Sequence, residues 1–203
     1  MPEKLTAEEV NSKTDPSVSK QWDTSTPRET QVDEFFKFAD SMKVGLLTTM
    51  REGVGPVSRS MAIAKRDGPD FLFFANNHSD KFADLKNSST VQLTFQNSSS
   101  QDWASITGTA SSSSSDPRIK ELFGKSAAIW YGDLGDGVHN ATADDPRVSL
   151  IELKPTYITH WKSTVGSVGF MKEAAVAAAT GEVAVTGLNR RFEGKDIEAL
   201  RKS

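Results

Sequence analysis

The chain changes from helical to strand periodicity at Val44, and the spacing of the strand-like runs that follow limits the folds it can adopt. Seven such runs succeed one another at short intervals and indicate about six strands, with no regular alternation of strand and crossover helix. The runs lie at Val44–Met50, Val57–Ala64, Phe71–Ala75, Val91–Phe95 and Trp103–Ala110, and Val148–Leu153 with Tyr157–Trp161 close the set. The sequence therefore predicts an α+β protein built on an antiparallel barrel or sheet.

Several helices are predicted around this sheet. The firmest start lies at Thr26, an N-cap residue followed by Pro27 at the first helical position and by Glu29 three residues after the cap. Apolar residues then recur at three- and four-residue spacing, as on a helix that lies on a core: Val32, Phe35, Phe36, Ala39 and Met42. Three further helices are predicted: one capped by Asp116 and opened by Pro117, one at Lys81–Lys86 and an alanine-rich one at Lys172–Thr180.

The 203 residues are predicted to form one domain with polar ends. Residues 1–26 are rich in Ser, Thr, Lys and Asp and lack an apolar face, so we expect a polar N-terminal arm. Residues 27–187 hold the helix and strand patterns and form the folded domain. Residues 188–203 are strongly charged and are predicted to be a C-terminal tail.

The composition limits the compartment and the binding partners that we expect for the protein. It contains no cysteine, which excludes disulfides, thiolate chemistry and cysteine-bound metals and suits a reducing compartment. The net charge of −3 provides no basic field to attract nucleic acid or anionic membranes. The first residues lack the apolar core of a signal peptide, and no run reaches membrane-spanning length. We therefore expect a cytoplasmic protein that binds neither nucleic acid nor membranes.

A basic and polar cluster lies where two predicted strands meet. Ser58–Ala64 and Phe71–Ala75 are joined by a turn that contains Gly and Pro, and in a hairpin the start of one strand lies beside the end of the other. Arg59 would then approach Ser79 and Lys81. A guanidinium, a hydroxyl and an ammonium at one place can receive a phosphate, with about 1.5–3 kcal/mol for each charge-assisted bond. An ordinary hairpin with solvated side chains explains the same residues.

The histidines and acidic residues do not predict a metal site or a catalytic group. His78, His139 and His160 do not pair at metal-ligand spacing. Asp144 and Asp145 precede a proline, a pattern typical of a turn. No nucleophile elbow supports Ser–His–Asp catalysis. The sequence therefore predicts no metal site and leaves any catalytic residues unknown.

The order of several motifs resembles a known family. In chain order the motifs are VGLLTTM, SRSMAIA, FLFFANNHSDK, VQLTF, WASITGTASSSSSDPRIKELF, DDPRVSLIEL and YITHW. Together they resemble the FMN-binding split barrels related to pyridoxamine-5′-phosphate oxidase. Within that family they are most similar to the general-stress-protein group, which includes blue-light-induced proteins of filamentous fungi. The resemblance covers roughly residues 26–187 and implies a six-stranded antiparallel split β-barrel with flanking helices. It also implies a homodimer that binds FMN at the subunit interface.

The resemblance further implies which residues contact the FMN. Three would hold the phosphate or the neighbouring ribityl chain, namely Arg59, Ser79 and Lys81. Four would lie against the flavin ring or its edge, namely Ser60, Met61, Ala75 and Asn76. Two aromatic residues would flank the site, the first by reaching the flavin of the other subunit, namely Trp103 and Trp161. Packing in a core or an interface is the alternative explanation for each tryptophan.

The sequence departs from the true oxidases at two places. They carry a lysine five residues after the strand arginine, where this chain has Ala64. They also end in a substrate-binding segment with arginine and histidine, whereas residues 188–203 contain no histidine. The resemblance therefore implies an FMN-binding redox protein of a stress or light response, rather than a pyridoxamine phosphate oxidase. The alternative is a non-enzymatic module of the same fold that holds a flavin, haem or a deazaflavin, or no ligand at all.

Overall fold

The structure is a computed structural model of the chain and describes residues 5–201. These residues form two compact units, each of which combines three stretches of the chain. Unit 1 contains residues 5–39, 96–104 and 159–191, and unit 2 contains residues 40–95, 105–158 and 192–201. Parts of the predicted arm (1–26) and tail (188–203) belong to these units, while residues 1–4 and 202–203 lie outside the described range.

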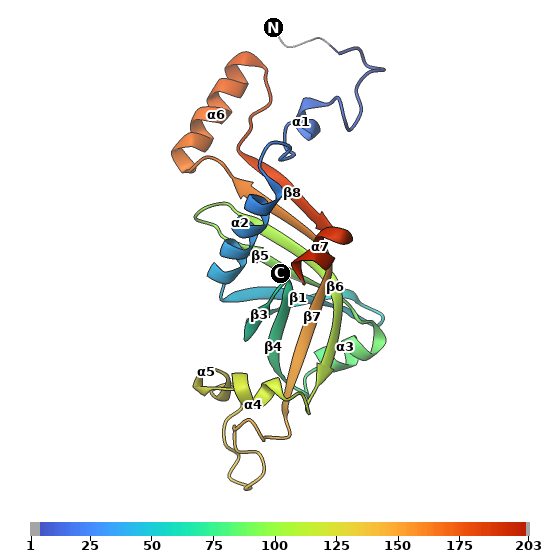
Figure 1. Cartoon of the computed structure of the whole chain (residues 1–203), viewed down its shortest axis with the longest axis vertical. Helices are drawn as coiled ribbons and strands as arrows, with labels where there is room; N and C mark the ends of the chain where they lie inside the picture. Colours follow the sequence, from blue (N-terminus) through green and yellow to red (C-terminus); the bar gives the residue numbers. More distant parts are fainter. Residues whose placement is uncertain (1–4, 202–203) are drawn as a thin grey trace. The chain divides into compact units, whose positions relative to one another are not determined.

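Eight strands form one antiparallel sheet (Figure 1). They pair in the order β2-β1-β5-β6-β7-β4-β3, and β8 pairs with β7. Their bounds are β1 Val44–Arg51, β2 Gly55–Ala62, β3 Lys65–Asp67, β4 Asp70–Asn76, β5 Thr90–Gln96, β6 Trp103–Ser113, β7 Val148–Ser163 and β8 Gly187–Glu193. Within the described residues, β2 and β3 end this order without pairing to each other, so the sheet is not closed.

The predicted α+β class and antiparallel sheet are confirmed, but the predicted number of six strands is wrong and the sheet does not close as a barrel. The strand β3 has only three residues, too few for an alternating pattern to be recognised. The strand β8 lies in the charged segment, where Arg190 occupies a buried position. Because arginine is mostly exposed in proteins, a sequence pattern does not reveal a strand that turns one inward.

The two strands predicted at the end of the set are one continuous strand, β7. Its centre contains Pro155, which has no N–H for the sheet and interrupts the apolar pattern. The neighbouring strand β6 accommodates this point through Gly108, where a Cβ atom would overlap the carbonyl group of Lys154 and the Cα of Pro155. The missing side chain therefore allows the two backbones to approach closely.

The core of unit 2 is formed by the middle strands of the sheet. Residues 71–73 of β4 are fully buried, as predicted for a continuous apolar run. The strand β5 alternates, with Val91, Leu93 and Phe95 buried and the residues between them partly exposed. Burial of each such side chain contributes about 1.5–3 kcal/mol, so these strands fix the sheet on which the candidate site lies.

The chain changes its pairing partner between β2 and β3. The Ile63 N–H donates to the Lys43 carbonyl oxygen beside β1 (3.0 Å), whereas the next N–H, of Ala64, donates to the Leu72 oxygen of β4 (2.8 Å). The strand β2 therefore pairs with β1, and of the two strands β2 and β3 it is the short β3 that pairs with β4. The predicted hairpin between the Arg59 strand and β4 is corrected accordingly, because the turn residues close only the β3–β4 hairpin.

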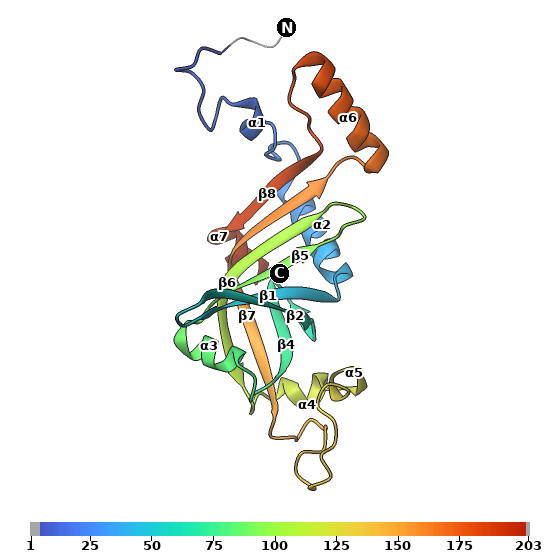
Figure 2. The same cartoon turned by 180° about the vertical axis from the view of Figure 1, so that it is seen from behind.

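Four short helices belong to unit 2: α3 Lys81–Asn87, α4 Arg118–Leu122, α5 Lys125–Ala128 and α7 Lys195–Leu200. Figure 2 shows α3 beside β1, and α4 and α5 beyond the ends of β4 and β7. At the start of α4, Asp116 Oδ1 accepts a hydrogen bond from the Arg118 N–H (2.9 Å) as predicted, although the helix begins at Arg118, one residue after the predicted Pro117. Arg118 also forms an ion pair with Glu152 of β7 (2.7 Å), which attaches α4 to the sheet.

Unit 1 contains α1 Pro16–Ser19, nearly all of α2 Arg28–Ser41, and α6 Ser167–Thr180. The helix α2 starts beside the predicted Thr26–Pro27 signal and buries Phe35 and Phe38 against His160 of β7. Arg190 of β8 is paired with Asp23 (2.8 Å), so part of the predicted arm is attached to the sheet. Among the described helices, none has the length and apolar character needed to cross a membrane.

Candidate ligand-binding site

Unit 2 contains a cavity of about 640 Å³, a size typical of small-molecule sites. Its walls come from β2, β4, the start of α3 and the segment that follows α4. The lining residues are Lys43, Val44, Ser60, Met61, Ala62, Ile63, Ala64, Phe74, Ala75, Asn76, Lys81, Leu122, Ser126, Ala127, Trp130 and Tyr131. Because the chain changes its pairing partner between β2 and β3, the end of β2 and the end of β4 both line this cavity.

Five of the nine residues implied by the family resemblance line this cavity: Ser60, Met61, Ala75, Asn76 and Lys81. They come from β2, from β4 and from the first position of α3. The predicted convergence of these segments therefore occurs, although by a different strand pairing from the predicted hairpin. Two more of the nine, Arg59 and Ser79, lie next to lining residues without lining the cavity themselves.

Lys81 is the central charged group of the cavity wall. Its Nζ donates a hydrogen bond to Ser79 Oγ (2.7 Å), and that hydroxyl donates to the Asn76 carbonyl oxygen (2.6 Å). Among the described residues, no carboxylate forms an ion pair with this half-buried ammonium. Burial lowers the pKa of Lys81, the positive charge of Arg59 lowers it further, and Asp80 opposes both. A bound anion would relieve both effects, because it supplies the missing counter-charge.

Arg59 is held by protein groups. Its Nη2 donates to Asp84 Oδ2 (3.0 Å), and its Nη1 donates to Thr49 Oγ1 (2.6 Å). Asp84 is buried and also accepts from Arg51 Nε (3.1 Å). Burial favours the neutral carboxyl, but the hydrogen bonds from Arg51, Thr49 and Arg59 outweigh it and lower the pKa of Asp84 to about 2. Asp84 therefore holds the Arg59 guanidinium in place next to the lining residue Ser60.

The segment around α5 forms a cavity wall that the sequence did not predict. Trp130 and Tyr131 follow α5 directly and line the cavity, as do Ser126 and Ala127 within the helix. The apolar pattern indicated a helix near residue 119 but did not show which surface its end would face. An indication available in the sequence was the adjacent pair of large aromatic residues at the start of a Gly- and Asp-rich loop.

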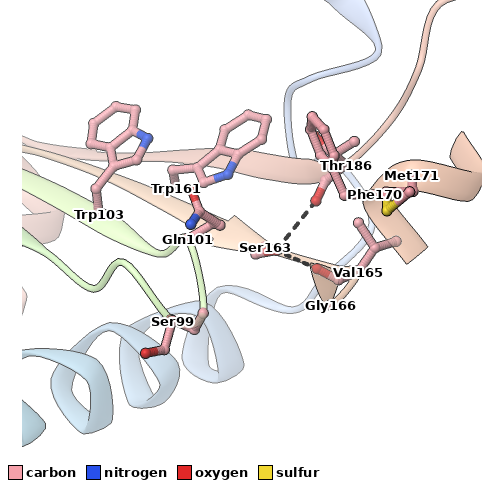
Figure 3. A pocket seen from close by; sticks show the side chains of 11 residues that line it. Ser99, Gln101, Trp103, Trp161, Ser163, Val165, Gly166, Phe170, Met171 and Thr186 are labelled. Carbon is pink, nitrogen blue, oxygen red and sulfur yellow. Dashed lines mark hydrogen bonds between the residues drawn. The ribbon is translucent and has the colours of Figure 1, made fainter. Parts of the chain in front are cut away.

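Trp103 and Trp161 lie elsewhere, on a cavity of about 540 Å³ within unit 1 (Figure 3). Its lining residues are Ser99, Ser100, Gln101, Trp103, Trp161, Ser163, Val165, Gly166, Phe170, Met171 and Thr186. The two indoles project from the neighbouring strands β6 and β7. Gly187 of β8 lets the Trp161 ring pack closely, since a Cβ there would overlap it. The structure does not place these tryptophans on the Lys81 cavity of the same chain.

His160 packs in the core, and Asp145 of the acidic pair holds a turn. His160 is fully buried between Phe35 and Phe38, and neither ring nitrogen has a hydrogen-bond partner among the described residues. The described residues contain no group of three or more His, Asp or Glu arranged to hold a metal ion. Asp145 accepts the Arg147 N–H (2.9 Å) and pairs with its guanidinium (2.7 Å), in agreement with the predicted turn.

Sequence comparisons identify the family. Residues 30–184 match the family described as pyridoxamine 5′-phosphate oxidase like. The chain is also 32% identical over 200 residues to Protein bli-3 of Neurospora crassa, an alignment that covers 97% of this chain and 96% of that protein. The chain belongs to the pyridoxamine 5′-phosphate oxidase-like family, and the resemblance stated from its motifs, including the link to a fungal relative, is confirmed.

Solved structures share the fold. One is a protein from Clostridium acetobutylicum related to general stress protein 26 of B. subtilis (pyridoxinephosphate oxidase family), with a TM-score of 0.61, 17% identity and coverage of 84% of this chain and 99% of that chain. Another is a pyridoxamine 5′-phosphate oxidase-related, FMN binding protein from Nostoc punctiforme, with a TM-score of 0.53, 14% identity and coverage of 69% and 87%. At these identities the likeness establishes the fold alone.

Proposed function

We propose that the cavity of unit 2 binds FMN and that the protein is a flavin-dependent redox protein of a stress or light response. The observation that carries the proposal is Lys81, a half-buried ammonium on the cavity wall that has a hydroxyl beside it and, among the described residues, no carboxylate paired with it. The Nostoc punctiforme protein of the same fold is described as FMN binding, which supports the assignment of the ligand.

The phosphate would be received by Lys81 Nζ and Ser79 Oγ, which already lie 2.7 Å apart. Arg59 would contribute mainly its field, because its two terminal nitrogens are engaged by Asp84 and Thr49. This arrangement refines the assignment from the resemblance, in which Arg59 contacts the phosphate or ribityl chain directly. The positive field of Arg59, reduced by its ion pair with Asp84, would favour a dianionic group beside Lys81 without an additional contact.

The flavin ring would lie along Ser60 and Met61 of β2 and along Ala75 and Asn76 of β4, all of which line the cavity. FMN supplies the redox chemistry when it is bound, and the protein supplies binding and orientation. Of the described lining residues, none is a carboxylic acid or a histidine. The described residues therefore offer no carboxylic acid or histidine at the cavity for moving a proton. This favours a second candidate function, a flavin-holding module without an enzymatic substrate.

We further propose that the protein is a homodimer in which Trp103 and Trp161 of one chain flank the flavin of the other. The helix α6 in unit 1 exposes several large apolar side chains, among them Val168 (83% exposed), Met171 (72%) and Phe170 (54%). Phe170 and Met171 also line the tryptophan cavity. Contiguous exposed apolar side chains of this kind are typical of a surface that another protein covers, here a second copy of the chain.

The test of the ligand is a visible absorption spectrum of the purified protein, followed by titration of the ligand-free protein with FMN. We expect an oxidised-flavin spectrum and a 1:1 FMN stoichiometry per chain. A haem or deazaflavin spectrum would replace FMN by that ligand, and failure to bind FMN at all would leave an empty module. Rapid reduction of bound FMN by a nicotinamide donor would favour the redox protein over the flavin-holding module.

A further inference from the structure

We infer that the cavity of unit 1 binds a ligand of its own, an uncharged planar aromatic molecule. The indoles of Trp103 and Trp161 form the surface on which this molecule stacks, and Gln101 makes its polar contact. The binding itself is independent of the Lys81 cavity. Its role as the substrate of a redox protein rests on the proposed function, because the flavin beside this cavity belongs to the proposed dimer. The family resemblance assigns no second ligand to these residues.

The first observation is that the cavity has the size of a small-molecule site and carries no charge. Its volume is about 540 Å³, and its described lining residues include no Asp, Glu, Lys, Arg or His. Asp102 and Lys162, which adjoin the two tryptophans in the sequence, pair with each other (3.3 Å). A charged ligand would therefore lose its water without gaining a counter-charge, so the cavity favours an uncharged ligand.

The second observation is an aromatic surface on a rigid base. Trp103 begins β6, Trp161 lies in the neighbouring strand β7, and both side chains are partly exposed at the cavity (Figure 3). The Trp161 ring packs on β8 at Gly187, where an added Cβ would overlap it. Phe170 adds a third ring to the lining. Because the strands hold the indoles in place before a ligand arrives, stacking of a flat ring on them costs little conformational entropy.

The third observation is a strained residue in the cavity wall. Gln101 lines the cavity with a φ of 63°, and among the described residues other than glycine only Ala141 shares a positive φ. Such left-handed residues are uncommon and concentrate at ligand sites. The side chain of Gln101 is exposed, and its Nε2 donates to the Ser98 carbonyl oxygen. Its Oε1 is therefore left to accept a hydrogen bond from a polar substituent of the ligand.

The ligand inferred here differs from the flavin. Under the proposed function the flavin ring lies along β2 and β4 of the Lys81 cavity, with its phosphate held there. The ring would then border the unit 1 cavity of the other chain as one wall and would not fill it. An uncharged aromatic molecule stacked on the indoles would lie against that ring, and a molecule held against a reactive group in this way is positioned as a substrate.

The experiment measures binding of 2-naphthol and of 2-naphthoate, which has the same ring system and a negative charge. Isothermal titration calorimetry is carried out on the full chain, both free of ligand and saturated with FMN. Saturation fills the Lys81 cavity, where the anion could otherwise bind. We expect 2-naphthol to bind both forms of the protein. We expect 2-naphthoate to bind the FMN-saturated form at least about tenfold more weakly than 2-naphthol, because its charge finds no partner.

Two variants and a matched control assign the binding to this cavity. Trp103→Leu should weaken 2-naphthol binding about five- to tenfold through loss of the stacking surface. Trp130→Leu, which removes an exposed tryptophan from the other cavity, should leave it unchanged. Gln101→Gly should weaken it about threefold or more. The melting temperature of Gln101→Gly should stay the same or rise, because glycine adopts a positive φ freely. A lower melting temperature would mean that Gln101 serves the loop and would overturn its assignment.

The outcomes separate this inference from the proposed function. The inference is wrong if 2-naphthol does not bind at millimolar concentration, or if Trp103→Leu binds it as tightly as wild type. It is also wrong if FMN displaces 2-naphthol, since the flavin ring itself would then fill the cavity while the FMN site stands. If the protein binds no FMN but binds 2-naphthol through Trp103, the proposed function fails and the ligand site of unit 1 stands.

Discussion

At the scale of single residues, the sequence predicts that both Lys81 and Arg59 bind the phosphate, but the structure gives these two basic side chains different hydrogen-bond partners. Among the described residues, Lys81 Nζ donates a hydrogen bond only to a hydroxyl, whereas Arg59 is bound to the buried carboxylate of Asp84. Removal of Arg59 would leave Asp84 with fewer donors, and an incompletely paired buried carboxylate destabilises the fold. Loss of FMN binding in an Arg59 variant would therefore combine a stability effect with a binding effect, while a Lys81 variant reports binding alone.

The prediction at this scale concerns Lys81→Met. We expect FMN to bind about 10- to 100-fold more weakly, which corresponds to the loss of one charge-assisted hydrogen bond to the phosphate. Riboflavin, which lacks the phosphate, should bind with an affinity within about threefold of its wild-type value. Fluorescence titration measures both constants. Lys86→Met is the matched control, because Lys86 is an exposed lysine on the same helix and does not line the cavity. Equal losses for both flavins would show that Lys81 acts on something other than the phosphate.

At the scale of elements, His160 connects β7 to α2 and makes their packing sensitive to pH. The pKa of His160 is lowered to about 4: burial has the largest effect, Arg190 and Lys162 act in the same direction, and Asp102 and Glu34 oppose them. The unfolded chain, with an ordinary histidine pKa near 6.5, then binds more protons than the folded chain between about pH 4 and pH 6.5. The contribution of neutral His160 to the free energy of unfolding is therefore fully present above this pH range and is lost as the pH decreases through it.

The prediction that follows is that the free energy of unfolding drops by about 3 kcal/mol between pH 6.5 and pH 4, and that His160→Leu removes most of this drop. At pH 7 the variant should be about as stable as wild type, because the imidazole makes no hydrogen bond among the described residues. Denaturant unfolding at a series of pH values measures the slope, with His78→Gln, an exposed histidine, as the control. An unchanged slope in His160→Leu would assign the drop to other groups. Asp84 affects stability in a different pH range. Because its pKa is lowered in the folded chain, the stability that it contributes is lost only as the pH falls below about 3.8.

The sequence predicted those elements whose residues repeat with a clear period. The buried run of β4, the alternation of β5 and the capped start of α4 are all found in the structure. It did not predict β3, which is too short to show a period, or β8, whose inward Arg190 is neutralised by Asp23, far away in the chain. Such pairing depends on tertiary contacts, and no local pattern contains it.

The candidate site was predictable to the extent that local motifs carry it. Ser60, Met61, Ala75, Asn76 and Lys81 come together because they end two neighbouring strands and begin the helix that follows. Tyr131 and Trp130 reach the same cavity from a segment more than forty residues further along the chain. Their position depends on the anchoring of the α5 end at the start of β7, which only the folded structure shows.

At the scale of the whole molecule, the two cavities of one chain would serve different flavins in a dimer. We expect light scattering to give twice the 22.1 kDa mass of the chain, and we expect Trp103→Ala to weaken FMN binding although Trp103 does not line the Lys81 cavity. The reason is that the indole would contact the flavin bound to the other subunit. A 22.1 kDa species that retains FMN would exclude the shared site.

A mixing experiment tests the same arrangement more directly. When a Lys81→Met chain and a Trp103→Ala chain form a mixed dimer, one site receives Lys81 from one chain and Trp103 from the other and is intact, while the second site lacks both. We expect mixed dimers to regain one tight FMN site per pair of chains, measured by titration after the two variants are unfolded and refolded together. If Trp103 acts within its own chain, mixing restores no tight site.

At the same scale, the positions of the basic side chains bear on whether the protein can oxidise pyridoxamine phosphate. That substrate carries its own phosphate, so its oxidation requires a second anion receptor beside the one that holds FMN. The strand lysine of the true oxidases is replaced by Ala64, a residue of the cavity wall. The arginines of the last segment are engaged elsewhere: Arg190 is buried in its pair with Asp23 (2.8 Å), the Arg191 guanidinium lies over the Trp22 ring at 4.7 Å, and Arg201 pairs with Asp70 (3.2 Å).

We therefore predict that the FMN-loaded protein has little or no pyridoxamine phosphate oxidase activity. Positioning a substrate against a reactive group can supply several kcal/mol of the barrier, roughly 7–11 kcal/mol in favourable cases, and without the second receptor this contribution is lost. Hydrogen peroxide release after addition of pyridoxamine phosphate measures the activity, with bound FMN quantified by absorbance in the same sample so that an inactive protein is known to be loaded. Turnover at the ordinary enzymatic rate of about 1 s⁻¹ or more would contradict the prediction and would require the second phosphate to bind at a place other than Ala64, Arg190 or Arg191.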